Sequence, residues 1–483
     1  MNTKLLKQKI LDLAIRGKLT QQLKSDGAAK ELLTQISEQK RESSSTLSSP
    51  RRRGSPSAQS EKTIIPLDKN EAPCEIPANW EWVRLGDLCN ASSGKTPSTS
   101  QKEFWNGNVL WVTSKDVKQK YIDSTQICLS DLGASSMQLY PPKTMIIVGR
   151  SGILRHTLPV AILKKSATVN QDLKALVFKD DRIVEFVYAV IKGMEQHLLH
   201  EYKKAGTTVD NLNFDLFLTA PIPLPPLAEQ QRIVEKIQDA FAEIDSIENN
   251  KELLKNHIKQ ARQKILDLAI HGKLVPQNKA DEPASVLLER ITRDNPHYEK
   301  LTDIPFEIPE SWEWVKLGDV GKWQSGTTPS KSNSSYYKDG TIPWLNTGDL
   351  NDGIICEIPK KVTEKALAET SLRLNEAGSV CIAMYGATIG KIGILSMPAT
   401  TNQACCVCNN LKKFVNQMWL FYFLKNHKQE FIEAGFGGAQ PNISKEKITA
   451  TLFPLPPLAE QKRIVDRIEE IFASLDEISL HLV

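Results

Sequence analysis

The clearest hydrophobic pattern of the chain lies between residues 227 and 271. Apolar residues spaced alternately by three and four positions form the seam of a coiled coil. One run has the seam residues Val234, Ile237, Phe241 and Ile244, and the next has Leu254, Ile258, Ala261, Ile265 and Leu268. The phase of the pattern shifts between the two runs, which predicts a stutter or a break near Asn249 and Asn250.

Both ends of this predicted helix carry recognisable signals. Pro225 and Pro226 suit a helix start, and Glu229 complements the helix dipole in the first turn. Gly272 is a typical C-terminal stop. The sequence therefore predicts a helix over Leu227–His271, which would be roughly 67 Å long if it is unbroken.

Parts of the same helix recur at the two ends of the chain. PLPPLAEQ occurs at Pro223–Gln230 and at Pro454–Gln461, and KILDLAI occurs at Lys9–Ile15 and at Lys264–Ile270. The C-terminus thus repeats the first half of the central helix and the N-terminus repeats its second half. We predict that the ends lie close together and complete a pseudo-twofold, circularly permuted repeat, with the partner seam Leu6, Ile10, Leu13, Val465, Ile468, Phe472 and Leu475.

Between the helical parts lie two similar segments, residues 73–222 and 305–453. Each opens with EIP, then WEWV and LGD, and short alternating or apolar runs typical of strands follow. Helical stretches come later in each segment, which predicts mixed α+β domains. Three cysteines, Cys405, Cys406 and Cys408, lie in an apolar run that predicts a buried strand. The interiors of the two segments hardly align, as expected for related readers of different targets or for drift after duplication.

These patterns divide the chain into seven parts. A Ser/Pro/Arg-rich stretch around Ser37–Lys62 has almost no large apolar residue, which predicts a disordered tether. The predicted parts are 1–20, the N-terminal half of the split helix; 21–72, a short helix and the tether; 73–222, the first domain; 223–275, the central helix; 276–304, a linker with a short helix; 305–453, the second domain; and 454–483, the C-terminal helix.

Composition narrows the class of protein. With 40% hydrophobic and 24% charged residues, the 483-residue chain has the composition of a soluble globular protein, and it is long enough for two or more domains. No apolar run is long enough to span a membrane, and the N-terminus has no signal-type core, so we expect a cytoplasmic protein. The eight cysteines and eight histidines lack metal-ligand spacing, so we expect no metal. The net charge of +4 permits a polyanionic partner without requiring one.

No catalytic motif is complete. SGKT at Ser93–Thr96 has Cys89 where a phosphate loop needs its first glycine. GATIGK at Gly386–Lys391 is one residue short, and NPHY at Asn295–Tyr298 has a histidine in the third place of an amino-methyltransferase motif. We therefore expect a chain without catalytic activity of its own and without a cofactor.

The repeated PLPPLAEQ-x-R-I-V and KILDLAI-x-GKL motifs, with the EIP-x-x-WEWV-x-LGD openings, resemble the DNA-specificity subunit of type I restriction–modification systems. The resemblance implies two target-recognition domains that each read one half of a bipartite, asymmetric site in double-stranded DNA. It also implies antiparallel coiled-coil helices that set the spacing and dock two modification (methyltransferase) subunits, which restriction (nuclease and translocase) subunits then join. S-adenosylmethionine and ATP with Mg²⁺ would belong to those partners. A stand-alone, two-headed DNA-binding regulator is the alternative.

Under this resemblance, polar and basic loop residues are the expected DNA contacts. Arg and Lys suit guanine and phosphate, whereas Asn and Gln suit adenine edges. By residue type alone, the candidates are Lys95, Lys115, Arg150, Arg155, Lys203 and Lys204 in the first domain and Lys331, Lys391, Gln440 and Asn442 in the second.

Overall fold

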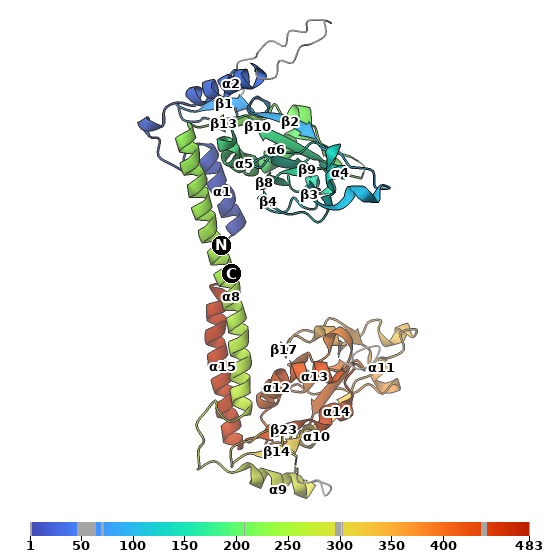
Figure 1. Cartoon of the computed structure of the whole chain (residues 1–483). Coiled ribbons are helices and arrows are strands. Elements are labelled where there is room, and N and C mark those ends of the chain that lie inside the picture. The colour runs from blue at the N-terminus through green and yellow to red at the C-terminus, as the bar shows by residue number, and fades with distance from the viewer. Residues whose placement is uncertain are drawn as a thin grey trace. The chain divides into compact units, whose positions relative to one another are not determined.

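The computed structural model describes residues 2–45, 64–68, 72–206, 208–294, 301, 303–435 and 442–482 (Figure 1). The chain forms two compact units, Met1–Asn250 and Lys251–Val483. The boundary between the units falls inside the longest helix, α8, which spans Leu227–Ile270. Each unit therefore combines one mixed α/β domain with part of α8 and one further long helix segment. No helix among the described residues could cross a membrane.

In unit 1 the domain is built on one five-stranded sheet and three smaller ones. Strand order in the large sheet is β2-β10-β6-β8-β4, and the smaller sheets are β1-β13, β5-β3-β9 and β11-β12-β7. The strands are β1 Glu81–Arg84, β2 Cys89–Ser93, β3 Trp105–Val112, β4 Tyr121–Ile122, β5 Cys128–Leu129, β6 Met145–Val148, β7 Arg150–Ser151, β8 Val160–Leu163, β9 Ala167–Val169, β10 Leu173–Phe178, β11 Lys203–Lys204, β12 Asp210–Leu212 and β13 Pro221–Leu224.

Unit 2 repeats this topology. Its large sheet has the order β15-β22-β19-β20-β17, and the smaller sheets are β14-β23 and β18-β16-β21. The strands are β14 Glu313–Lys316, β15 Lys322–Ser325, β16 Ile342–Leu345, β17 Gly353–Ile355, β18 Lys361–Val362, β19 Val380–Ala383, β20 Ile392–Leu395, β21 Thr400–Thr401, β22 Cys405–Asn409 and β23 Leu452–Leu455. The predicted buried strand with the three cysteines is confirmed as β22, in which Cys405, Cys406 and Cys408 are at most 1% exposed.

Helices cover the sheets and connect the domains to α8. In unit 1 they are α1 Thr3–Ile15, α2 Ala29–Ser45, α3 Leu85–Leu88, α4 Asp131–Ser135, α5 Val184–Gly193, α6 Glu195–Tyr202 and α7 Phe214–Phe217. In unit 2 they are α9 Ala284–Asp294, α10 Leu317–Val320, α11 Glu364–Glu369, α12 Gln417–Asn426, α13 Lys428–Gly435, α14 Lys445–Ala450 and α15 Leu458–Leu480. Helix α2 includes Ser37–Ser45, which the sequence assigned to the tether. Residues 46–62 of the predicted tether lie outside the described residues.

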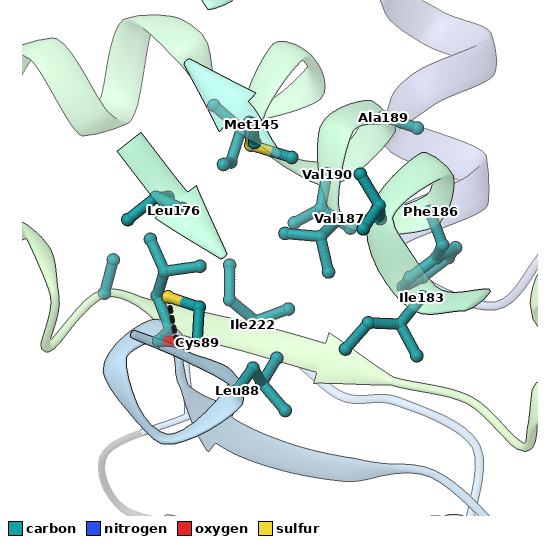
Figure 2. Packing of buried hydrophobic residues seen from close by; sticks show 14 of the residues in the cluster. Leu88, Cys89, Met145, Leu176, Ile183, Phe186, Val187, Ala189, Val190 and Ile222 are labelled. Carbon is teal, nitrogen blue, oxygen red and sulfur yellow. Dashed lines mark hydrogen bonds between the residues drawn. The ribbon is translucent and has the colours of Figure 1, made fainter. Parts of the chain in front are cut away.

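The core of unit 1 lies between the large sheet and α5. Figure 2 shows Met145 of β6 and Leu176 of β10 facing Val187 and Val190 of α5, with Ile222 of β13 below them. All five of these side chains are at most 1% exposed. Runs of adjacent buried residues, such as Met145–Val148, arise because both faces of the strand are covered.

Helix α8 is continuous, so the predicted break near Asn249 is absent. The phase shift is visible in burial instead. Ile244 is 4% exposed and Ile258 is 7% exposed, whereas none of residues 245–257, all of which the structure describes, is buried. Leu254, predicted as a seam residue, is 39% exposed. Leu254 lies about two turns before Arg262 in α8. Arg262 contacts Asp476, which is close to the end of α15 at Leu480. Leu254 is therefore near the level at which α15 ends and has little of that helix to pack against.

Two antiparallel helix contacts use α8. In unit 1, α1 lies beside the first part of α8, with contacts from Lys7 to Asp245 and from Thr3 to Glu248 (Figure 1). In unit 2, Arg262 of α8 donates to Asp476 of α15 at 2.6 Å. The guanidinium carbon of Arg262 also lies 4.8 Å from the ring centroid of Phe472. The two units thus have corresponding helix pairs.

The predicted seam describes only part of the helix burial. Ile237, Ile244, Ile258, Val465, Ile468 and Phe472 are buried, and Leu6, Ile10, Leu13, Val234, Phe241, Ile265, Leu268 and Leu475 are half-buried. The sequence pattern missed a second apolar face that packs on the domains. In α1 this face consists of Leu11, Ala14 and Ile15, and Leu11 and Ile15 both lie close to Gly193 of α5. A Cβ at Gly193 would lie 2.5 Å from Ile15 Cδ1 and 3.1 Å from Leu11 Cβ, so the close approach of α1 favours glycine here.

Candidate nucleic-acid interface

The small sheet β11-β12-β7 brings three of the predicted DNA contacts in unit 1 together. Asn211 of β12 pairs with Arg150 of β7 on one side and with Lys204 of β11 on the other. Directly opposed residues of antiparallel strands project from the same face. Arg150, Asn211 and Lys204 therefore form one row of side chains, with Arg150 and Lys204 exposed and Asn211 half-buried. We call this set the asparagine row of unit 1.

Lys203 and Arg155 lie on the other side of this sheet and face Asp210. The Lys203 Nζ atom is 3.4 Å from one carboxylate oxygen of Asp210, and Arg155 Nε is 3.8 Å from the other. The backbone N–H of Gly206 donates to Asp210 and lowers the pKa of its carboxyl, and the two cations act in the same direction. These contacts hold the loop before β12, so Lys203 and Arg155 have a structural partner within the domain.

The other candidates in unit 1 lie in two loops. Lys95 follows β2, and its backbone N–H donates to the carbonyl of Val169 at 3.0 Å. Lys115 lies in the turn after β3, which Asp116 closes by accepting from the backbone N–H of Thr113 at 2.8 Å. Both lysines are exposed. The structure does not place either of them in the asparagine row.

Unit 2 has an equivalent row around Asn442. Tyr385 and Asn442 form an isolated antiparallel bridge, and the Asn442 backbone N–H donates to the carbonyl of Gly435 at 3.1 Å. Tyr385, Asn442 and Gly435 thus correspond to Arg150, Asn211 and Lys204. The sequence identified Asn442 but missed Asn211, although DNLNF and PNISK both follow a glycine-containing stretch of the sequence and precede a short helix.

The remaining candidates of unit 2 lie around this row or apart from it. Lys391 is half-buried. It lies three residues after the turn Gly386–Thr388, which itself begins directly after Tyr385. Lys331 is exposed in the loop between β15 and β16. Gln440 lies outside the described residues.

In each unit an equivalent ion pair joins the start of a long helix to the segment that follows the other helix of the pair. Arg232 in the second turn of α8 donates to both carboxylate oxygens of Asp26, at 2.8 and 2.6 Å. Arg463 of α15 donates in the same way to Asp281, at 3.3 and 2.6 Å. The hydrogen bonds from Arg232 lower the pKa of Asp26. Bidentate pairs of this kind specify orientation as well as contributing energy, so they fix how the segment after α1 meets the start of α8 and how the segment after α8 meets the start of α15.

Comparison with known proteins shows which family the chain resembles. The family described as "Type I restriction modification DNA specificity domain" matches residues 77–256 and 309–480. The specificity subunit of the type I restriction enzyme EcoAI from Escherichia coli is 24% identical over 563 aligned residues, which cover 98% of this chain and 90% of the relative. The two matched ranges correspond to the two domains and the helix starts that follow them.

Two solved structures share the fold. One, described under "Structural basis underlying complex assembly and conformational transition of the type I R-M system", has a TM-score of 0.58 and 19% identity, covering 85% of this chain and 94% of that chain. The crystal structure of the HsdS subunit from Thermoanaerobacter tengcongensis has a TM-score of 0.52 with the same identity and coverage. Together with the duplicated family match, these findings show that the chain belongs to the type I restriction–modification DNA-specificity family and carries two specificity domains.

Proposed function

We propose that each unit reads one half of a bipartite, asymmetric site in double-stranded DNA, and that the asparagine row of each unit contacts base edges. The observation that carries this proposal is the pairing of a shared asparagine with different neighbours. Asn211 has Arg150 and Lys204 beside it, whereas Asn442 has Tyr385 and Gly435. Two domains of one topology would then present different hydrogen-bonding groups to two different half-sites.

The side chains of the rows fit base readout. An asparagine amide can bond adenine N6 and N7 together, and an arginine can do the same with guanine O6 and N7. Tyr385 has one hydroxyl group, and its exposed ring can contact a thymine methyl or stack. Unit 1 is therefore expected to require a guanine that unit 2 does not require.

The proposal assigns the remaining chemistry to partner subunits. We expect the helices α1, α8 and α15 to set the spacing between half-sites and to dock two modification subunits, with restriction subunits joining that assembly. S-adenosylmethionine and ATP with Mg²⁺ would bind to those partners, and this chain would be non-catalytic. Relatives that carry the name specificity subunit support this assignment over a stand-alone regulator.

Methylation by the reconstituted complex tests this function. The full chain should transfer no methyl group alone and should direct site-specific adenine methylation when a cognate modification subunit is added. Replacing residues 73–222 with the corresponding domain of a relative should change one half of the methylated motif and leave the other half intact. A change in both halves together, or methyl transfer by the isolated chain above a no-enzyme control, would contradict the proposal.

A further inference from the structure

An open pocket of about 520 Å³ adjoins the asparagine row of unit 1. Its walls come from β2, β10, β11, β12 and the start of α7. The charged and polar groups that line it include two lysines and one aspartate, and the residues used below are Ser93, Lys174, Lys204, Asn211, Phe214 and Asp215. The pocket thus joins a cationic wall to the row that we propose reads bases.

Lys174 is held in a defined place in this pocket. Its Nζ atom donates to Ser93 Oγ at 2.6 Å and lies 5.1 Å from the ring centroid of Phe214. Lys174 itself is half-buried in β10, opposite Ser93 of β2. A lysine ammonium has three N–H donors, and Ser93 uses one of them. The ammonium is therefore oriented and able to donate to an anion that enters the pocket.

The corresponding strand of unit 2 has no lysine at this place. Ser325 of β15 corresponds to Ser93, and its partner in β22 is Cys406, which is fully buried. The lysine comes instead from the short helix that follows the asparagine row. Lys445 is the first residue of α14, where unit 1 has Phe214 at the start of α7.

Lys445 therefore lies at the position equivalent to Phe214, on a helix that packs near the strand equivalent to β2. Helix α14 packs against β15, and the positive charge of Lys445 acts on the Cys406 thiol. That effect opposes burial, which raises the pKa of Cys406 to about 12. The residues at these two positions differ between the units, yet each unit has a lysine at one of them: Lys174, whose Nζ atom lies over the Phe214 ring, and Lys445, whose charge acts on Cys406. A lysine thus lies at this edge of the large sheet in both units, although a strand supplies it in unit 1 and a helix supplies it in unit 2.

We propose that Lys174 in unit 1 and Lys445 in unit 2 are equivalent phosphate contacts, each binding a backbone phosphate of the DNA next to the half-site that its unit reads. This inference rests on the proposed function. Lysine binds phosphate as a point charge and can do so from either wall of a pocket, whereas base readout depends on a fixed direction of hydrogen bonds. An exchange of the supplying strand or helix would therefore preserve a phosphate contact but disrupt a base contact.

The salt dependence of DNA binding tests the proposal. The full chain in complex with its modification subunits would be titrated with a duplex that contains its methylated site, at salt concentrations from 0.05 to 0.3 M. Each neutralised phosphate contributes about −0.9 to the slope of log K against log salt. Lys174→Gln and Lys445→Gln should each reduce the slope by about one and weaken binding about five-fold at 0.15 M salt. Specific and non-specific duplexes should be affected alike, and the methylation motif should not change.

Matched variants separate this result from unfolding and from general charge effects. Lys174→Arg should keep the wild-type slope. Lys165 is exposed in the turn after β8, close to the start of β6. Lys165→Gln therefore removes one lysine away from the pocket, and it should leave the slope of log K against log salt unchanged within error. Thermal unfolding midpoints of all variants should stay close to that of the wild type.

Several outcomes would overturn the inference while leaving the proposed function intact. An unchanged slope in Lys174→Gln and Lys445→Gln would exclude phosphate contacts, and an altered methylation motif would make the lysines base readers. Inorganic phosphate provides a further arm: if it stabilises the wild type but not Lys174→Gln, while the DNA slope is unchanged, the pocket binds a free anion instead. Failure of the wild-type complex to bind or methylate a bipartite site would count against the proposed function itself.

Discussion

The two asparagine rows occupy the same place in the two units and differ in the residues around a common centre. Asn211 lies between Arg150 and Lys204, whereas Asn442 lies between Tyr385 and Gly435. In both units the backbone pairing joins this asparagine to the second residue after a strand of the large sheet, β6 or β19. Arg150, Lys204 and Tyr385 are exposed, so these side chains can differ without loss of packing, whereas Gly435 is buried and has no side chain. A scaffold fixed by backbone contacts with variable exposed side chains suits a reader of different sequences.

The supporting core shows the opposite behaviour, with close equivalence between units. Trp80 meets Phe186 edge-on with ring centroids 6.2 Å apart, and Trp312 meets Trp419 in the same way at 6.0 Å. In addition, the Trp419 indole N–H donates to the carbonyl of Pro454 at 3.1 Å. The two units thus differ little in their densely packed cores and differ more where side chains are exposed.

The largest expected effect comes from removing an aromatic side chain of this core. Trp419→Ala should lower the free energy of unfolding of unit 2 by about 3–5 kcal/mol, because it leaves a cavity and an unpaired carbonyl. Phe186→Ala should do the same to unit 1 by a similar amount. Hydrogen exchange measured by mass spectrometry would show which unit opens. Equal loss of protection in both units after either substitution would contradict their independence as compact units.

Base readout by the rows predicts an intermediate effect on specificity. Arg150→Ala should cost about 1–3 kcal/mol of discrimination at one base pair of the half-site read by unit 1. Tyr385→Phe, which removes only the hydroxyl group, should affect the other half-site alone. Sequencing of methylated DNA measures both. If Arg150→Ala weakened binding to all duplexes uniformly, Arg150 would be a phosphate contact.

The proposed spacing role of α8 predicts a change in geometry and not in bases. Four residues inserted near Asn249 lengthen the helix by roughly 6 Å, which corresponds to one or two base pairs of about 3.4 Å. This site should tolerate the change because residues 245–257 contain no buried side chain. The gap in the methylated motif should grow by at most that amount.

A non-heptad insertion inside Val234–Ile244, such as the same four residues, is the control for that experiment. It would move Ile237 and Ile244 off the buried face and should destabilise the chain. Altered half-site bases with an unchanged gap would mean that α8 takes part in base contacts.

The smallest effect concerns two buried glutamates that start the long helices. Glu229 accepts from the Trp80 indole at 2.8 Å, and Glu460 accepts from Gln277 at 2.5 Å. Burial raises the pKa of Glu460, and the hydrogen bond from Gln277 and the positive charge of Arg463 only partly oppose this shift. Because folding raises this pKa, the protonated carboxyl stabilises the folded state of unit 2. This stabilisation is fully present below the pKa of the unfolded chain, about 4.3, and is lost as pH rises through the folded pKa.

Glu460→Gln should therefore become more stable relative to the wild type as pH rises from 4 to 8. Thermal unfolding midpoints over this range measure the trend, with hydrogen exchange at one pH to assign it to unit 2. Glu229→Gln is the matched variant. It should lower the stability of unit 1 slightly, because the bond from Trp80 loses its charged acceptor. A constant difference between Glu460→Gln and wild type across the range would contradict the assignment to this carboxyl.

The sequence alone determined the duplication, the two mixed domains and the long helices, because these depend on repeated motifs and local periodicity. It also placed both ends of α8 to within one residue, Leu227–His271 against the observed Leu227–Ile270. Gly17 and Gly272 have φ of 65° and 66° at the second position after α1 and α8, a backbone conformation that favours glycine. Local signals of this kind act over a few residues and are readable without knowledge of the fold.

Only the tertiary structure decided which charged residues are available to a ligand. Lys203 and Lys204 are adjacent in the chain, but strand alternation turns the first toward Asp210 and the second into the asparagine row. Asn211, Lys174 and Lys445 gained significance only through cross-strand pairing and helix packing. The same holds for Leu11 and Ile15, whose burial depends on α5 rather than on a helical seam. Long-range pairing sets these environments, and hydrophobic periodicity along one segment contains no information about the partner that faces it.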